Sequence, residues 1–315
     1  MTTDPHLVLV GDLRSSGRSR RELDRDRRAG DLVTVRRGVV SEHDLPDDAR
    51  AAHRVLLRAV RMVTGPTWVL SHHSACILWD LPVDARGLDR VWLTRPPGPG
   101  GHRRPGIMTR SCRVGRDEME LVDGFAVTSL ARTAVDMAME CGFATGLMVA
   151  DAVLGRGVER RAISDVVDRA RRRHGIGHAR AVLAAADARA ESPGESLLRA
   201  MLIAGGIDVP ELQYEIRDES GRFIARVDMA WPALGVVGEY DGKVKYGSLL
   251  RPGQRLDDVV MAEKVRENAL RALGWQVMRF SADDLAHRDR TLRMVTKVLD
   301  WAQRERGDGW TPLAS

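Results

Sequence analysis

Apolar and polar residues near the start of the chain follow helical spacing. Ser19, with Glu22 three positions later, has the pattern of a capping box and predicts a helix over residues 20–28 that ends at Gly30. A shorter helix is expected before it, over residues 12–16. Two short helices in succession are the first part of a helix-turn-helix arrangement.

The pattern then changes to the two-residue period of strands. Residues 32–36 alternate between apolar and polar side chains, and Arg37-Gly38 is a tight-turn pair before apolar residues 39–40. This pattern predicts a β-hairpin. Helix, turn, helix and hairpin in this order is typical of a winged helix-turn-helix, which we place at residues 1–48.

Residues 49–186 form a mixed middle region. Strands are expected at residues 91–93 and 107–112, and the pattern is helical again after Thr128. One helical packing face consists of Ala52, Val55, Leu56, Ala59, Val60 and Val63. We interpret this region as connecting scaffold and assign no chemistry to it.

Helix and strand patterns alternate in residues 187–315. Ser192 as N-cap, Pro193 at the first helical position and Glu195 at the third open a helix. The elements expected after it are strands at residues 212–217, 223–230 and 236–241, a helix at 258–273, a strand at 275–280 and a helix at 291–303. The sequence therefore predicts a multi-domain protein of the α/β and α+β classes, whose last domain is a layered α/β domain.

Charge and cysteine content bear on partners and compartment. The net charge is +5 and the sequence pI is near 9.5, and a basic surface attracts phosphate backbones without specifying them. Cys76, Cys112 and Cys141 form no CxxC pair, which fits a reducing compartment. His72 and His73 lack a second pair of ligands nearby, so we predict no zinc site. We find no signal-peptide pattern or membrane-spanning run and expect a cytoplasmic protein without a membrane partner.

Acidic residues recur at strand positions in residues 187–315. Asp228 lies on the strand face opposite Val227 and Met229, because side chains alternate along a strand. Glu239 stands in the next strand, and pairing of the two strands can bring it close to Asp228. Glu195, in the preceding helix, can approach the same point. Clustered carboxylates are ligands suited to Mg²⁺ held against a phosphate.

Asp241, two residues after Glu239 and on the same strand face, is a further candidate for the catalytic site, but it and Glu195 also have simpler explanations. Glu195 fits the third position of a capping box, and Asp241-Gly242 is a common turn pair. Asp228 is harder to explain in this way, because Asp is depleted in strands. Asp228 and Glu239 are therefore the metal ligands that we expect.

Three motifs carry a resemblance to a known superfamily: SPGESLLR, RVDMAWPALGVVGEYDG and EKVRENALRALGWQVMRF, in this order. They resemble the PD-(D/E)xK restriction-endonuclease-like superfamily, and within it the domains related to very-short-patch repair endonucleases. The resemblance covers residues 192–284. It implies a restriction-endonuclease-like α/β domain in which Asp228 and Glu239 bind Mg²⁺ and Glu195 is an auxiliary acid.

The resemblance further implies a lysine two residues after the second acid, where it helps to position the attacking water and to stabilise developing charge. Asp241 holds that place in this chain. Lys243, Lys245 or, from the following helix, Lys264 are the candidates to replace the lysine. The departure leaves two alternatives open, a domain that cleaves and a degenerate domain that only binds.

The N-terminal stretch GDLRSSGRSRRELDRDRRAGDLVTVRRGVV is similar to the winged-helix head of the abortive-infection type IV antitoxin (AbiEi) family. LSHHSACILWDLP and VTSLARTAVDMA extend the similarity over residues 5–150. The similarity implies DNA binding, in which phosphate contacts position the module and base contacts specify it. The residues expected to contact DNA are Arg18, Arg20, Arg21, Arg25 and Arg28 on or beside the second helix, and Arg36 and Arg37 at the wing. The alternative is an Arg-rich helix that is merely solvated.

The leading hypothesis from the sequence is a DNA-binding protein with Mg²⁺-dependent phosphodiester cleavage by residues 187–315. The first alternative is a non-catalytic transcriptional regulator or type IV antitoxin that uses a degenerate nuclease fold for binding. The second is a protein-binding antitoxin that restrains a nucleotidyltransferase-type toxin encoded beside it.

Overall fold

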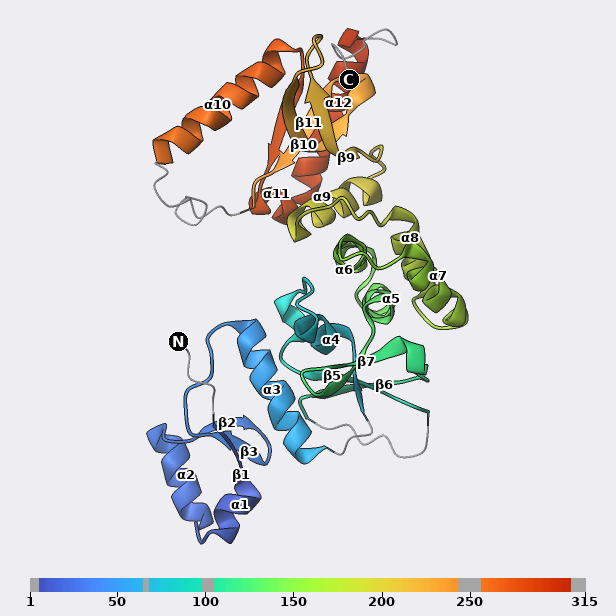
Figure 1. Cartoon of the computed structure of the whole chain (residues 1–315). Coiled ribbons are helices and arrows are strands. Elements are labelled where there is room, and N and C mark those ends of the chain that lie inside the picture. Colours follow the sequence, from blue (N-terminus) through green and yellow to red (C-terminus); the bar gives the residue numbers. More distant parts are fainter. Residues whose placement is uncertain (1–5, 65–67, 98–104, 243–255, 307–315) are drawn as a thin grey trace. The chain divides into compact units, whose positions relative to one another are not determined.

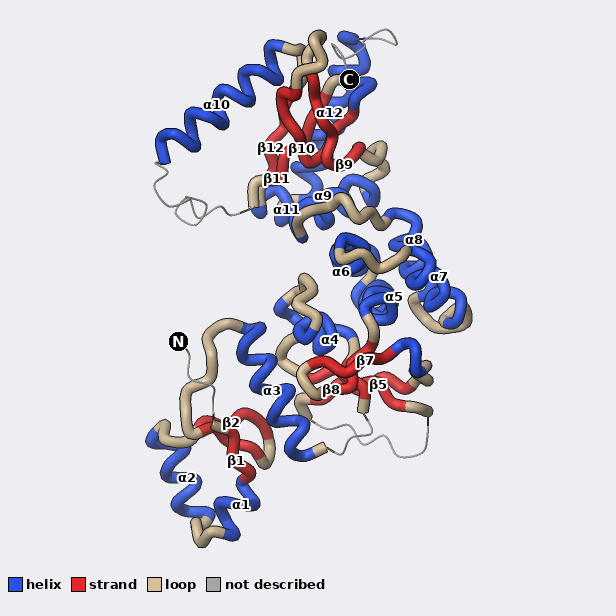
Figure 2. Tube along the Cα trace, viewed as in Figure 1, coloured by secondary structure: helices blue, strands red, loops and turns tan. Residues whose placement is uncertain are grey.

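The computed structural model describes residues 6–64, 68–97, 105–242 and 256–306. The chain divides into two compact units, residues 1–153 with 158–184 and residues 154–157 with 185–315. Both units combine helices with β-sheet (Figures 1 and 2), which confirms the mixed α/β, multi-unit organisation expected from the sequence. No helix within the described ranges is both long and apolar enough to cross a bilayer.

The first unit begins with two helices and a small sheet of order β1-β3-β2. Its elements are β1 (Leu7–Leu9), α1 (Val10–Ser15), α2 (Arg20–Ala29), β2 (Val33–Arg36) and β3 (Val39–Ser41). The predicted capping box is present, since Ser19 N donates to Glu22 Oε2 at 2.7 Å and Glu22 N donates to Ser19 Oγ at 3.3 Å. Gly30 ends α2 with φ at 86°, a left-handed conformation that favours glycine. Strand β1 was not predicted, because three apolar residues in a row show no alternation.

A five-stranded sheet of order β6-β5-β4-β8-β7 follows in the first unit. The elements are α3 (Ala49–Val63), β4 (Val69–Leu70), α4 (His72–Leu78), β5 (Val91–Arg95), β6 (Ile107–Ser111), β7 (Met119–Val122) and β8 (Phe125–Thr128). Four helices come after the sheet: α5 (Leu130–Cys141), α6 (Phe143–Gly155), α7 (Arg160–Arg169) and α8 (Ile176–Ala185). The strands predicted at residues 91–93 and 107–112 are β5 and β6, whereas β4, β7 and β8 were missed.

The second unit contains a four-stranded sheet of order β12-β11-β10-β9. Its elements are α9 (Pro193–Ala204), β9 (Glu211–Arg217), β10 (Phe223–Trp231), β11 (Val236–Tyr240), α10 (Leu256–Ala272), β12 (Gln276–Phe280), α11 (Ala282–Ala286) and α12 (Arg288–Arg306). The first three strands are antiparallel neighbours, and β12 pairs with β11 in parallel. The predicted order of helix, three strands, helix, strand and helix is present, with α11 added.

Two apolar clusters cover this sheet. Helices α9 and α12 contribute to one cluster, which contains Leu212 and Met229. Leu270 of α10 belongs to the other cluster, which contains Tyr214 and Val227. Figure 1 shows α10 beside the sheet, with α9 and α11 near the sheet end at which β9 begins. The second unit is therefore a layered α/β unit.

Candidate functional site

The strand registers place four polar residues in one row across the second unit's sheet. Met229 of β10 pairs with Leu212 of β9 on one side and with Gly238 of β11 on the other. Extending this antiparallel register by one residue places Asp228 between Gln213 and Glu239. Glu239 in turn pairs with Arg279 of β12. One residue from each of the four strands thus enters the row. The two acids that the sequence singled out are cross-strand neighbours in it.

Gln213 has a left-handed backbone, with φ at +52°, inside strand β9. Such a conformation is costly for a residue with a side chain and persists only where the surroundings hold it. On either side of it, Leu212 and Tyr214 belong to different apolar clusters, although alternate residues of a regular strand share a face. The irregular backbone therefore changes the face that β9 presents beside Asp228.

Asp228 is partly buried, and its Oδ2 accepts a hydrogen bond of 2.8 Å from the backbone N–H of Tyr240. Burial raises the pKa of the Asp228 carboxyl, and the Tyr240 hydrogen bond opposes this effect. The carboxylates of Glu195 and Glu191 raise the pKa further, whereas Arg266 lowers it. Burial is therefore the largest effect on this pKa, and the two neighbouring carboxylates add to it.

Glu239 is buried, with 6% of its surface exposed. Its Oε1 lies 2.6 Å from Nη1 of Arg266, which comes from α10. Its Oε2 lies 3.3 Å from Nη2 of Arg279. Two guanidinium groups therefore compensate the charge of a carboxylate that water hardly reaches.

Asp241 occupies the position at which the resemblance implies a lysine. It is exposed, and its Oδ2 lies 3.2 Å from Nη1 of Arg279. Glu267 of α10 contacts the same arginine, at 3.3 Å from Nη2. Arginines from α10 and β12 thus contact Glu239, and sequence reasoning missed both.

Of the three lysines considered as replacements, only Lys264 lies among the described residues. Lys243 and Lys245 lie outside the described residues. Lys264 is exposed and, within the described part of the chain, forms no ion pair with Asp228 or Glu239.

Glu195 is buried, and its carboxylate turns toward β9. Its Oε2 accepts hydrogen bonds from Gln213 Nε2 at 3.2 Å and from the N–H of Glu191 at 3.0 Å. Ser192 Oγ accepts from the N–H of Glu195 at 3.1 Å, as an N-cap does. The capping-box explanation accounts for this backbone bond only, because the carboxylate binds Gln213 and Glu191.

Gly194 allows the first turn of α9 to approach β11. A Cβ at this position would lie 1.9 Å from Cε1 of Tyr240, so a side chain does not fit unless the ring moves. The backbone of the same Tyr240 binds Asp228. One residue of β11 therefore touches both Asp228 and the turn that carries Glu195.

The donor set has the chemistry of a Mg²⁺ site, since Asp228 and Glu239 offer carboxylate oxygens. Asp228 Oδ1 accepts no hydrogen bond from the described residues. No group of three or more His, Cys, Asp or Glu within the described ranges is arranged to hold a metal ion. A cation at Glu239 would have to compete with Arg266 and Arg279.

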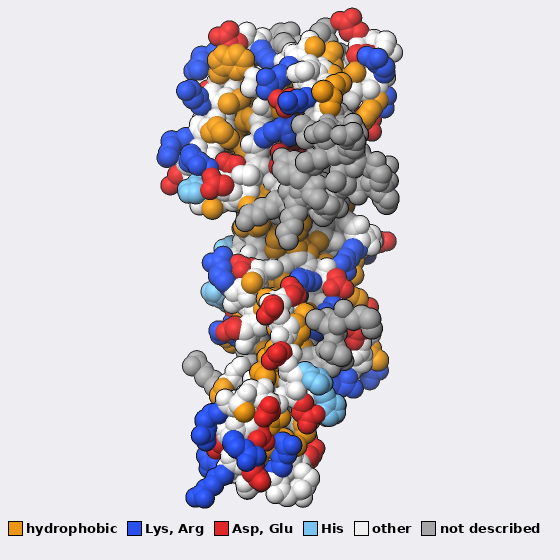
Figure 3. Space-filling view, turned by 90° about the vertical axis from the view of Figure 1, so that its left-hand side faces the viewer, with side chains coloured by type: hydrophobic (Ala, Val, Ile, Leu, Met, Phe, Trp, Pro, Cys, Tyr) orange, Lys and Arg blue, Asp and Glu red, His pale blue; other side chains and the backbone are white. Residues whose placement is uncertain are grey.

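Several N-terminal arginines pair with acids of α2. Arg18 Nη1 and Arg25 Nε each lie 3.3 Å from a carboxylate oxygen of Asp26. Arg20 Nε lies 3.9 Å from Oδ2 of Asp24. Figure 3 shows basic and acidic side chains side by side on the face that it draws. These pairs reduce the charge that α2 can offer to a phosphate.

The remaining candidates differ in exposure. Arg28 is exposed, and its Nε donates to the carbonyl of Asp24 at 3.1 Å. Arg36 is partly buried. Arg21 and Arg37 are exposed and form no ion pair with any described residue. The structure therefore separates seven arginines that the sequence treated alike.

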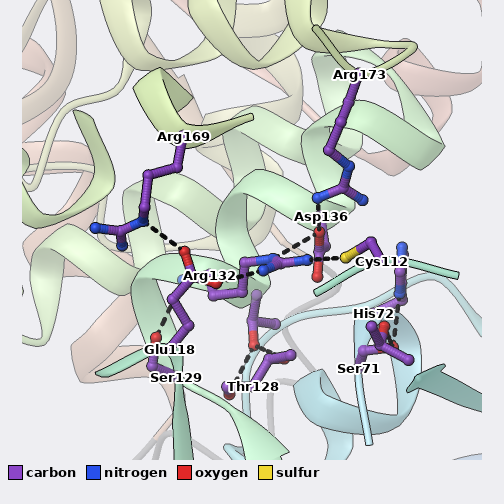
Figure 4. A network of polar contacts seen from close by, with 12 residues as sticks. Ser71, His72, Cys112, Glu118, Thr128, Ser129, Arg132, Asp136, Arg169 and Arg173 are labelled. Atoms are coloured by element: carbon purple, nitrogen blue, oxygen red, sulfur yellow. Dashed lines mark hydrogen bonds and ion pairs between the residues drawn. The ribbon is translucent and has the colours of Figure 1, made fainter. Parts of the chain in front are cut away.

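A buried polar network in the first unit was missed by sequence reasoning. Arg132 of α5 pairs with Glu118 Oε2 at 2.6 Å through Nη1 and with Asp136 Oδ1 at 3.0 Å through Nε. Its Nη2 donates to Cys112 Sγ at 2.8 Å (Figure 4). Asp136 and Arg132 are four residues apart on one helix, which was a readable signal. The other two partners lie on separate elements.

Three histidines of the first unit are also buried. The rings of His72 and His73 stack on Trp92, with centroid distances of 5.2 and 4.9 Å. His72 Nδ1 lies 2.9 Å from Ser71 Oγ. Burial lowers the pKa of His53 and His72, and lowers that of His73 to about 4. All three are therefore held as neutral imidazoles at neutral pH.

Comparison with known proteins gives relatives but no activity. No protein-family model matches the chain. It is 31% identical over 289 residues to "Uncharacterized protein MT2308" and "Uncharacterized protein Rv2248", from two strains of Mycobacterium tuberculosis, with 90% of this chain and 98% of each relative covered. A crystal structure of the RV2827C protein from Mycobacterium tuberculosis matches with a TM-score of 0.40 and 13% identity, over 68% of this chain and 84% of that one.

Proposed function

The chain belongs to the same protein family as MT2308 and Rv2248 of Mycobacterium tuberculosis, and from its own residues we propose a nucleic-acid-binding protein whose C-terminal acids serve Mg²⁺-dependent phosphodiester cleavage. The observation that carries the proposal is the register that sets Asp228 beside Glu239 in a row that ends in Arg279. Carboxylates for a cation and guanidinium groups for a phosphate then stand together.

In this proposal Asp228 and Glu239 hold the cation, and Glu195 is an auxiliary acid behind them. A bound Mg²⁺ ion would polarise the scissile phosphate and neutralise charge on it. Arg266 and Arg279, released from Glu239 by the cation, would donate to phosphate oxygens. In this way they would take over the charge stabilisation for which the superfamily has a lysine. Asp241 keeps a pairing role with Arg279.

Gln213 positions the acids in this proposal. Its Nε2 binds the Glu195 carboxylate, and the register sets it across from Asp228. Its left-handed backbone is the kind of local strain that a stable fold tolerates at functional sites.

The N-terminal helices and hairpin act in this proposal as a winged helix-turn-helix that grips DNA. Arg21 and Arg37 are the favoured phosphate contacts, because their charges are not compensated by described neighbours. The resemblance to the AbiEi family supports this role. A toxin partner and a cytoplasmic location stay predictions from the sequence.

The second candidate function is a non-catalytic regulator that binds DNA with the same fold. The observation that favours it is the occupation of both Glu239 oxygens by arginines, together with the acid at the lysine position. If these pairs are permanent, the acids stabilise the unit and hold no cation.

A cleavage assay separates the two functions. Purified protein is incubated with supercoiled and linear DNA in Mg²⁺ or Mn²⁺. The proposal predicts nicking that stops on chelation and is lost in Asp228→Asn and in Glu239→Gln, while DNA binding persists. Glu215→Gln, an exposed acid of β9, is the matched control and should keep full activity. Normal binding without cleavage on any substrate would favour the regulator.

A further inference from the structure

Besides the N-terminal arginines, the first unit has a second group of basic residues, where α7 ends. A hollow of about 540 Å³ is lined there by Asp168, Arg169, Arg171, Arg172 and Arg173. Tight turns follow the helix, with Arg171 N bonded to the Asp168 carbonyl at 3.3 Å and Arg173 N to the Ala170 carbonyl at 2.8 Å. At about 3.6 residues per turn, a continuing helix would place residues 169, 172 and 173 on one face and residue 171 on the opposite one. The hollow instead gathers them.

Buried acids fix two of these arginines. Arg169 Nε lies 2.8 Å from Glu118 Oε1, and Arg173 Nη1 lies 3.5 Å from Asp136 Oδ1. Figure 4 shows both arginines reaching the acids that Arg132 joins underneath. These ion pairs hold Arg169 and Arg173 in place, and the acids neutralise part of the positive charge of the two arginines. Arg169 and Arg173 therefore line the hollow as fixed side chains.

The other two arginines are different. Arg171 and Arg172 are exposed and form no hydrogen bond or ion pair through their side chains with any described residue. Two adjacent like charges repel each other, and Asp168 is the single acid among the lining residues described. An anion bound in the hollow would relieve this repulsion.

We propose that this hollow is a phosphate site that takes backbone phosphates of nucleic acid, with Arg171 and Arg172 as its contacts. The planar guanidinium group presents paired N–H donors that match phosphate oxygens. Nucleic acid as the source of the phosphate rests on the proposed function. The phosphate chemistry itself does not, and a free polyphosphate is the other source that the test distinguishes.

The test compares two double variants of the full chain. Arg171→Ala with Arg172→Ala removes the proposed contacts. Arg161→Ala with Arg180→Ala removes two exposed arginines of α7 and α8 that do not line the hollow, so the net charge changes equally. Duplex binding is measured by fluorescence anisotropy from 50 to 200 mM KCl, and thermal melts establish that both variants are folded.

The proposal predicts a log–log salt slope flattened by about 1.8 in the Arg171/Arg172 variant, since each phosphate contact adds about −0.9. Over the fourfold salt range the unmodified chain then loses about tenfold more affinity than this variant. The control variant keeps a steeper slope. Equal slopes in the two variants would overturn the site and leave the proposed function standing.

If the chain binds no duplex at any salt concentration, the proposed function fails and the site is tested alone. Arginine labelling by phenylglyoxal is then mapped with and without tripolyphosphate. Protection of Arg171 and Arg172, with Arg161 and Arg180 still labelled, supports a phosphate site fed by a free anion. If tripolyphosphate changes the labelling of all four arginines equally, or of none of them, the phosphate site is overturned.

Discussion

Arg266 of α10 contacts Glu239 of β11 at 2.6 Å between Nη1 and Oε1, so a helix and a strand of the second unit are joined by a largely buried ion pair. The partner arginine, Arg279, is two-thirds buried as well. Breaking such a pair from one side leaves a buried charge without compensation, which costs more than the pair itself contributes. The contact is therefore a sensitive point for both stability and cation binding.

Replacing Arg266 by Met should lower the free energy of unfolding by about 2 kcal/mol, because Glu239 then loses its closest cation. Urea unfolding measures the change. Lys264→Met, an exposed position of the same helix, is the control and should stay within about 0.5 kcal/mol. Adding Glu239→Gln to Arg266→Met should recover part of the loss. A double variant that loses more free energy of unfolding than the two single variants lose together would contradict the pairing.

Replacing Gly194 by Ala should lower the free energy of unfolding by about 1–3 kcal/mol, because the new methyl group meets the Tyr240 ring. The same clash should weaken cation binding by Asp228 and Glu239. Gly177→Ala in α8 provides the control, since a Cβ there meets nothing within 4 Å and helical Ala is favoured over Gly by about 1 kcal/mol. Thermal melts report both variants. An unchanged melt for Gly194→Ala would show that the Tyr240 ring moves at no cost.

Elements with strong local signals could be predicted from the sequence. The Ser19 capping box, the Gly30 helix end and the Ser192 cap each depend on neighbours within a few residues. The strands that were missed, such as β1 and the two-residue β4, are too short to show a period. Their strand conformation is imposed by pairing with distant segments.

Only part of the site around Asp228 could be predicted from the sequence, because its other residues are brought there by tertiary structure. Alternation placed Asp228 on its own face, and the register then sets it beside Glu239. Gln213 could not be identified, because its left-handed backbone is fixed by the tertiary structure and leaves no mark in the sequence. Arg266 and Arg279 were missed because their role depends on how α10 and β12 pack on β11.

Replacing Arg21 by Ala should flatten the salt slope of duplex binding by about 0.9, because its uncompensated charge is free to meet a phosphate. Arg25→Ala should change the slope less, since Asp26 already holds that guanidinium at 3.3 Å. Anisotropy titrations over a range of KCl concentrations give both slopes. A larger effect at Arg25 than at Arg21 would mean that the pairs seen in α2 break on binding.

The first unit should lose stability in mild acid because of its buried histidines. Their folded pKa lies below the ordinary 6.5, so the unfolded chain binds more protons between the two values. The free energy of unfolding should therefore be flat above about pH 7, fall below 6.5 and level off near 4 for His73. Tryptophan fluorescence with urea at each pH measures this, and His73→Gln should make the fall shallower. A pH-independent free energy from 7 to 5 would contradict it.

The most direct test of the central claim is Mn²⁺ binding, followed by the loss of the free-ion signal in electron paramagnetic resonance. We expect one bound ion per chain at neutral pH and none in Asp228→Asn or Glu239→Gln, with Glu211→Gln as the exposed β9 control that retains it. Arg266→Met should tighten binding, because it removes a competitor for Glu239. Protons should displace Mn²⁺ from Asp228 at a higher pH than from an ordinary carboxylate, since burial raises the pKa of Asp228. Equal binding in Asp228→Asn and the unmodified chain, or no binding by the folded protein at millimolar Mn²⁺, would contradict the account.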